Sequence, residues 1–188
     1  MKTYLIIAGV NGPGKSTLFE SGKYFPEGTR ENRVNADEEL KSINGDSNNK
    51  VDQLKGGKIA VKKMKGFISS GKSFHQETTL SGLTDIQRIR DAKDSGYKIM
   101  INYIALENSN LARQRVANRV KLGGHDIPDE DIERRFKKSL ENLKKAAPLA
   151  DVIHIFDNSS NTMQEIYFRD GDEVVIDDLS RYPWISLD

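Results

Sequence analysis

The sequence predicts an α/β fold in which a largely parallel β-sheet is covered by helices. Short apolar runs of strand length alternate along the chain with longer stretches of helical periodicity, a pattern typical of βα units. A glycine-rich segment, residues 9–17, directly follows the first apolar run. The length of 188 residues fits one domain, residues 1–188, that can bury a core without disulfides or metals.

The core elements are expected in alternating order. Strands are predicted from apolar runs at residues 4–8, 33–35, 73–77, 97–105 and 152–156. Helices are predicted from periodicity at residues 15–21, 59–70, 84–95, 111–121 and 129–146. The last helix has the clearest start, because Pro128 suits a first turn and the acids after it favour the positive end of the helix dipole.

Two segments are expected outside these units. Residues 43–58 are rich in Gly, Asn, Asp, Ser and Lys, and we interpret them as an exposed connection. Residues 165–169 and 173–176 flank Asp170-Gly171-Asp172, which resembles a hairpin turn. The fold is therefore expected to end in a small C-terminal hairpin.

Composition limits the classes of function. The chain has no cysteine, so it offers neither disulfides nor thiolate metal ligands. Its charges cancel to a net of +1, which gives no broad basic field for nonspecific nucleic-acid binding. The first apolar run is too short for a signal peptide, and no later stretch approaches a membrane span. We expect a cytoplasmic protein that binds neither nucleic acid nor membrane.

A phosphate-binding pattern, G-x-x-x-x-G-K-S, runs from Gly9 to Ser16. In such loops a strand enters and a helix leaves, so that backbone N–H groups and the helix N-terminus face the phosphates. Both flanks are predicted here. Lys15 is expected to reach the β- and γ-phosphates and Ser16 to ligate Mg²⁺. The predicted nucleotide-binding residues of the loop are Gly9, Asn11, Gly12, Gly14, Lys15, Ser16 and Thr17.

The rest of the sequence separates three classes that share this loop. A GTPase should show an N-K-x-D type base-reading motif after a later strand, and none follows the predicted strands from residue 73 onward; the match at residues 49–52 lies inside the expected connection. An ABC ATPase should carry a full L-S-G-G-Q signature, whereas residues 80–83 supply only a fragment. A small-molecule kinase of the adenylate-kinase layout needs a carboxylate after the second strand and mobile arginines over the phosphates. This chain offers both.

Two groups of polar residues follow predicted strands, at the edge where open α/β sheets bind ligands. Asp37 follows the second strand and could deprotonate an acceptor hydroxyl; the alternative is that it only caps a helix. Glu77 ends the third strand and could pair with a substrate hydroxyl or a Mg²⁺-bound water. Thr78 and Thr79 could bind substrate or cap the next helix.

A basic cluster marks a predicted helical lid over residues 111–136. Its two helices are joined through Gly123-Gly124, so their guanidinium groups could fold over a triphosphate. For any one arginine, simple solvation is the alternative. The cluster consists of Arg113, Arg115, Arg119, His125, Arg134 and Arg135.

In their order, these motifs resemble the zeta-toxin-like P-loop kinases, in particular the short stand-alone branch often labelled predicted ABC-type ATPases. The resemblance extends to about Ser159 and rests on residues 9–17, 35–38, 77–82, 123–128 and 157–159. It implies an adenylate-kinase-like core, ATP with Mg²⁺, and phosphorylation of a substrate hydroxyl. In the zeta toxins the acceptor is a UDP-amino sugar, UDP-N-acetylglucosamine.

Carried over by position, the resemblance implies roles for individual residues. Lys15 and Ser16 match the phosphate and Mg²⁺ residues, and Asp37 matches the catalytic base. Arg119 matches one lid arginine, but His125 stands where the toxins carry the other, which Arg134 or Arg135 could replace. We expect catalysis by Lys15, Asp37, Arg119 and Arg134, and acceptor binding by Asp37, Glu77, Thr78, Thr79 and His125.

Two questions stay open in the sequence. Asn158, after the last parallel strand, is expected near the adenine, although a turn would also explain it. The competing hypothesis for the whole chain is an ATP-binding regulatory module without a small-molecule acceptor. A separate antitoxin protein is a partner that the sequence neither supports nor excludes.

Overall fold

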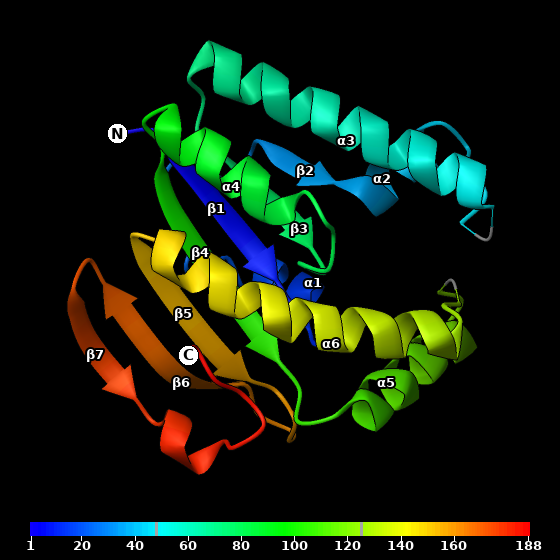
Figure 1. Cartoon of the computed structure of the whole chain (residues 1–188). Helices are drawn as coiled ribbons and strands as arrows, with labels where there is room; N and C mark the ends of the chain where they lie inside the picture. Colours follow the sequence, from blue (N-terminus) through cyan, green and yellow to red (C-terminus); the bar gives the residue numbers. More distant parts are fainter. Residues whose placement is uncertain (48, 125) are drawn as a thin grey trace.

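The computed structural model describes residues 1–47, 49–124 and 126–188 and contains a seven-stranded sheet of order β2-β3-β1-β4-β5-β6-β7 (Figure 1). The first five strands in that order run parallel, and β6 and β7 are antiparallel. The predicted parallel sheet and C-terminal hairpin are thus confirmed. The strands are β1 (Thr3–Ala8), β2 (Arg33–Asn35), β3 (Phe74–Thr78), β4 (Lys98–Ala105), β5 (Val152–Asp157), β6 (Gln164–Asp170) and β7 (Glu173–Asp177).

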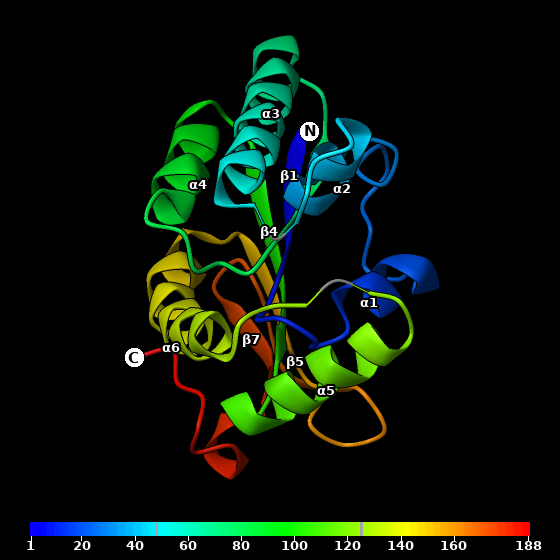
Figure 2. The ribbon, with the colours of Figure 1, turned by 90° about the vertical axis from the view of Figure 1, so that its right-hand side faces the viewer.

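Helices cover both faces of the sheet, as Figure 2 shows with the sheet seen edge-on. Three of them, α3, α4 and α6, lie on one face, and α1 lies on the other. The α5 helix packs beside α6 at the edge where the parallel strands end. The helices are α1 (Lys15–Ser21), α2 (Ala36–Ser42), α3 (Lys50–Ser70), α4 (Asp85–Asp94), α5 (Ser109–Lys121) and α6 (Asp129–Ala146).

The central strand β1 is buried over its full length because it contributes to a core on each face. Tyr4 and Ile6 pack in the cluster that holds α3, α4 and α6. Leu5 and Ile7 point the other way and pack with Leu18 of α1. This alternation follows from the two-residue repeat of a strand. It explains why β1 has a continuous apolar sequence rather than an alternating pattern.

The interpretation of residues 43–58 as a connection is wrong for their second half. The α3 helix begins at Lys50, because the side chain of Asn49 accepts the backbone N–H groups of Val51 and Asp52 at 2.8 and 3.4 Å. Gly56 then lies inside the helix, where α3 crosses α2. A Cβ atom there would stand 2.9 Å from the Ala36 carbonyl oxygen, so the glycine serves close packing rather than a loop.

No helix in the described part of the chain is both long enough and apolar enough to cross a bilayer.

Candidate active site

A cleft of about 1110 Å³ opens where β1, β2 and β3 end. Its walls come from the loop after β1, the start of α2, one face of α3, the loop after β3, and the lid helices α5 and α6. The cleft brings together most of the site residues predicted from sequence, namely Asn11, Gly12, Gly14, Lys15, Ser16, Asp37, Glu77, Thr78, Thr79, Arg119 and Arg134. Gly9, Thr17 and Asn158 do not line it, and His125 lies outside the described residues.

The phosphate-binding loop joins β1 to α1 and depends on glycine at its two ends. Gly9 has φ +141°, and a Cβ atom there would stand 2.3 Å from the Ile104 carbonyl oxygen. Gly14 has φ +102° and forms the N-cap of α1. Both positions therefore exclude side chains, for conformational as well as steric reasons. The backbone is left open to an anion at the start of the helix.

The side chain of Lys15 folds back over this loop. Its Nζ donates hydrogen bonds to the carbonyl oxygens of Gly9 and Val10, at 2.7 Å each. Burial lowers its pKa to about 8, while the carboxylates of Glu77 and Asp37 oppose that shift. The cation is thus held at the centre of the loop by contacts within six residues of itself.

Four charged side chains act on the Lys15 ammonium although they come from four different elements. Glu77 ends β3, Asp37 lies in α2, Arg119 in α5 and Arg135 in α6. The two carboxylates favour the charged ammonium and so raise its pKa, and the two guanidinium groups disfavour it and lower the pKa. Acidic and basic side chains from four elements therefore act together on the Lys15 ammonium.

Asn158 supports the loop from the end of β5. Its side-chain Nδ2 donates to the Pro13 carbonyl oxygen at 2.8 Å. The backbone carbonyl oxygen of Asn158 accepts from the Arg115 guanidinium of α5 at 2.5 Å. A Cβ atom on Gly14 would stand 2.8 Å from Asn158 Nδ2. The side chain therefore lies against the outer side of the loop, and its predicted contact with the nucleotide base stays a prediction.

Asp37 lies in the first turn of α2 with its side chain exposed to the cleft. The sequence left open whether this residue is a helix cap. The N-cap is Asn35, whose Oδ1 accepts the backbone N–H of Asp37 at 3.0 Å. Capping is therefore provided by the preceding asparagine, and the Asp37 carboxylate is not needed for it.

Glu77 is almost fully buried at the end of β3. Arg33 donates to its Oε1 at 2.5 Å and reaches Glu38 at 2.8 Å, while the guanidinium stacks 3.9 Å from the ring centre of Phe19. Burial raises the pKa of Glu77, and Arg33 and Lys15 oppose the rise. The contact with Arg33 thereby fixes the direction of the carboxylate, and Lys15 acts on it electrostatically.

The residues present fit a magnesium ion of the kind held by nucleotide kinases. Such an ion takes one or two protein oxygens and otherwise phosphate and water. Ser16 and Glu77 both line the cleft and could supply a hydroxyl and a carboxylate. Among the described residues, no group of three or more His, Asp or Glu could hold a metal by itself.

The loop after β3 presents hydroxyl groups to the cleft. The Thr79 and Ser81 hydroxyls lie 2.7 Å apart, and both residues line the cavity. Thr78 also lines it, but its Oγ1 accepts the backbone N–H of Leu80 at 3.0 Å. Thr79 is therefore better placed than Thr78 to contact a ligand.

The lid contributes two neighbouring arginines in different settings. Arg134 is 61% exposed at its side chain and pairs with Asp131 at 2.8 Å. Arg135 is 24% exposed and reaches Asn11 of the phosphate loop at 3.4 Å. Helical spacing gives the signal that distinguishes them, because position 135 shares the buried face of α6 with Ile132 and Ser139.

Sequence reasoning missed one wall of the cleft altogether. The face of α3 that lines it repeats at helical intervals through Gln53, Leu54, Gly57, Lys58, Val61 and Met64. The first four of these residues fall in the segment interpreted as a connection. Gly57 leaves open space, since no atom lies within 4 Å of a Cβ built on it.

A parallel sheet with a glycine-rich loop between β1 and α1, and a lid of arginines facing that loop, defines the P-loop class of α/β proteins with a kinase-like layout. The sequence model described as Zeta toxin matches residues 1–170. The chain therefore belongs to the Zeta toxin family, which confirms the resemblance recognised from the motifs.

Similar proteins agree with this assignment. An uncharacterized protein of Haemophilus influenzae is 30% identical over 132 residues, covering 70% of this chain and 91% of that protein. The PezAT chromosomal toxin-antitoxin system of Streptococcus pneumoniae includes a chain of the same fold, with TM-score 0.64, 17% identity, and coverage of 89% of this chain and 72% of that one.

A second similar structure is the AvrRxo1-ORF1:-ORF2 complex with ATP. The TM-score is 0.75 at 19% identity, over 98% of this chain. This chain spans 63% of the matched one. At this level of identity the likeness concerns the fold.

Proposed function

We propose that this protein is a phosphotransferase that moves the γ-phosphoryl group of ATP to a hydroxyl of a small molecule. The observation that carries the proposal is the convergence of Lys15, Asp37 and Glu77 with two lid arginines in one cleft. Loop cation, acid and arginines are the parts that phosphoryl transfer requires. The kinase-like fold and the family membership support the same reaction.

On the donor side, the phosphates of ATP would lie on the backbone N–H groups of the loop and the start of α1. Lys15 would exchange its contacts with the Gly9 and Val10 carbonyl oxygens for the β- and γ-phosphates. Arg119, with Arg135 or the predicted Arg134, would neutralise the charge of the group in transfer. Ser16 and Glu77 would hold Mg²⁺, which would supply positive charge beside the phosphates.

On the acceptor side, the Asp37 carboxylate would take the proton of the acceptor hydroxyl. The freed oxygen attacks the γ-phosphorus, and the bond from that phosphorus to the bridging oxygen of ADP breaks. The phosphorylated acceptor, ADP and one proton are the products. Because Asp37 is not the helix cap, its carboxylate oxygens are available for this role.

A UDP-amino sugar such as UDP-N-acetylglucosamine is the acceptor we propose, with Glu77 and Thr79 as contacts. The support is the family resemblance together with the size of the cleft, which extends from the phosphate loop along α3. Asp37 lines the same cleft and acts electrostatically on Lys15, which supports a place near the transferred phosphoryl group. The exposed polar groups of Gln53 and Lys58 suit a charged, hydrogen-bonding ligand.

The test is incubation with ATP, Mg²⁺ and a panel of hydroxyl acceptors including UDP-N-acetylglucosamine, with mass spectrometry to detect one added phosphoryl group. Asp37→Asn should slow transfer by about a hundredfold or more and leave ATP affinity unchanged. Glu39→Gln is the control, because Glu39 lies in the same helix and pairs with Lys63 outside the cleft.

Two results would contradict parts of the proposal. Full activity in Asp37→Asn would remove Asp37 as the base. No transfer to any acceptor, with ATP binding that is weakened in Lys15→Ala, would favour the regulatory ATP-binding module instead.

A separate antitoxin protein is part of the proposal as a partner, because the similar PezAT protein belongs to a toxin-antitoxin system. We also propose a cytoplasmic location, where ATP and nucleotide sugars would be available. Co-purification of the tagged chain from its own host tests the partner. Recovery of the chain alone would count against it.

A further inference from the structure

The loop after β3 holds a backbone conformation that its own sequence does not favour. Leu80 has φ +54°, in the left-handed region that leucine rarely adopts. Its side chain is fully buried in the main core. The same short loop carries Thr79 and Ser81, whose hydroxyls face the cleft. The surroundings of this loop must therefore fix its shape.

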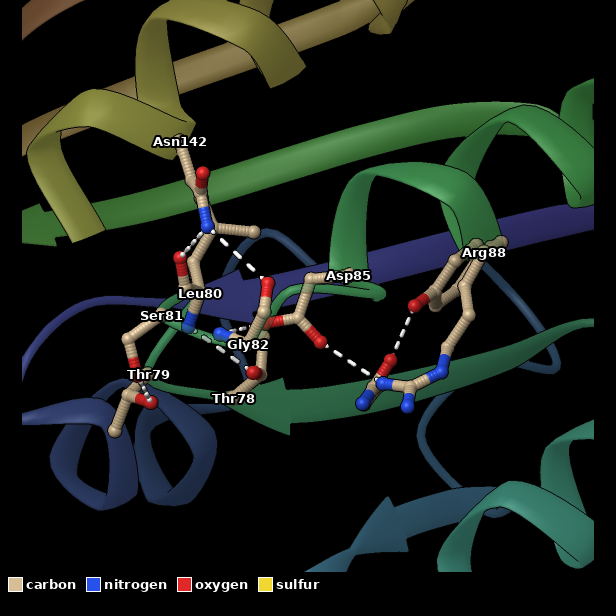
Figure 3. A network of polar contacts seen from close by, with 10 residues as sticks. Thr78, Thr79, Leu80, Ser81, Gly82, Asp85, Arg88 and Asn142 are labelled. Carbon is tan, nitrogen blue, oxygen red and sulfur yellow. Dashed lines mark hydrogen bonds and ion pairs between the residues drawn. The ribbon is translucent and has the colours of Figure 1, made fainter. Parts of the chain in front are cut away.

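The contacts that fix it come from two helices, α6 and α4, on the same face of the sheet (Figure 3). From α6, Asn142 Nδ2 donates to the carbonyl oxygens of Leu80 at 2.9 Å and Gly82 at 3.3 Å. From α4, the Asp85 carboxylate accepts the Gly82 N–H at 2.9 Å. Both Asn142 partners are acceptors, so the amide nitrogen must face the loop. Asn142 is 4% exposed, which makes the contact inaccessible to competing water.

The same face of α6 also reaches the phosphate loop. Arg135, Ser139 and Asn142 follow at intervals of four and three residues, so they lie in one row. Arg135 contacts Asn11, Ser139 pairs with the buried hydroxyl of Tyr103 at 2.8 Å, and Asn142 holds the loop after β3. One helix thus contacts both the phosphate loop and the loop after β3, with roughly 10 Å of helical rise between the two contacts.

We propose that Asn142 is a positioning residue that couples the two halves of the site. Through it, α6 holds the carbonyl groups of Leu80 and Gly82 in a fixed relation to Arg135, so that nucleotide bound at the phosphate loop stabilises the loop carrying Thr79. By linkage, an acceptor bound at that loop strengthens nucleotide binding by the same factor. This inference rests on nucleotide binding, as proposed above, but not on the transfer reaction.

The experiment is hydrogen exchange of the intact protein, read by mass spectrometry on peptides that cover residues 79–84. The probe is a non-hydrolysable ATP analogue with Mg²⁺. In the wild type the analogue should slow exchange in these peptides by at least about fivefold, the lower end of typical coupling between sites. In Asn142→Leu this slowing should disappear, while the affinity for the analogue alone stays within about twofold.

Ser139→Ala is the matched control, since it removes the other buried hydrogen bond of α6 without touching the loop. It should retain the slowing, and thermal melting of both variants shows that they are folded. Asn142→Asp serves as a second variant of equal size that loses the donating group. Slowing that persists in both Asn142 variants, or that is absent in the wild type, would overturn the coupling. The proposed kinase activity fails separately, when no acceptor gains a phosphoryl group.

Discussion

The two halves of the cleft are built in different ways. The part for which we propose ATP binding, here called the donor half, is nearly self-contained, because residues 9–15 supply the glycine conformations, the buried cation and both carbonyl contacts of Lys15. The part proposed for the hydroxyl substrate is called the acceptor half. The acceptor half is assembled from α2, α3 and the loop after β3, and its wall includes exposed side chains such as Leu54. A local segment therefore determines the donor site, whereas the acceptor site depends on tertiary packing and can vary residue by residue.

The largest test of this contrast compares two lysines that line the same cleft. Lys15→Ala should lower kcat/KM by about a thousandfold or more, since it removes the cation from the phosphate loop. Lys58→Ala, on the α3 wall, should leave ATP affinity unchanged and raise only the KM of the acceptor. Steady-state kinetics with each substrate varied in turn measures both. Equal losses of ATP affinity in the two variants would break the division into halves.

The lid arginines offer the next largest effect. Arg135→Ala should reduce kcat by about a hundredfold, because Arg135 reaches the phosphate loop through Asn11. Arg134→Ala should cost less than about threefold, since an exposed pair with Asp131 contributes little. Rates at saturating substrate compare the variants. The reverse order would restore the prediction made from sequence, in which Arg134 is the catalytic residue.

The donor half should also respond to pH through Lys15. Its pKa of about 8, lowered chiefly by burial, means that the free protein loses the ammonium proton above that pH. Bound phosphates favour the charged ammonium, so binding must recover the proton. ATP affinity should therefore fall by up to about tenfold per pH unit above pH 8. Calorimetric titrations from pH 7 to 9.5 should show this fall in the wild type and a flat profile in Lys15→Met.

The smallest expected effect is a change in acceptor KM, and it tests the acceptor half of the cleft alone. Gly57→Leu adds a side chain into the open space of the cleft and should raise the acceptor KM by about tenfold, with ATP affinity unchanged. Gly66→Leu is the matched control in the same helix, because its Cβ also meets nothing and it does not line the cleft. Both changes should stabilise α3 by about 1 kcal/mol. A similar KM in the two variants would place the acceptor elsewhere.

The division between the halves also explains how far the sequence could be interpreted. The donor loop and the five parallel strands depend on neighbouring residues, and both could be predicted. The start of α3 could not be predicted, because Gly56 and Gly57 were interpreted as loop residues. In the structure, Gly56 packs against the Ala36 carbonyl oxygen and Gly57 faces the cleft. A close approach between two helices cannot be recognised from the amino-acid composition of a segment.

Contacts between residues far apart in the sequence could not be predicted either. Asn142 lies 60 residues from Gly82, and Arg33 lies 44 residues from the Glu77 that it holds. Polar residues usually face water, in helices and in edge strands alike, so the sequence gives no reason to single out these two. The choice between Arg134 and Arg135 needed only the helical phase of α6, which its apolar residues do provide.

The neighbouring glycines of α3 have an evolutionary consequence. At position 56, substitution is blocked by the carbonyl of α2, so descendants of this protein should keep glycine there whatever they phosphorylate. At position 57 a single-base change can introduce alanine, valine, serine or a charged side chain directly into the acceptor space. Lineages could therefore change acceptor in one mutational step while inheriting the nucleotide site intact.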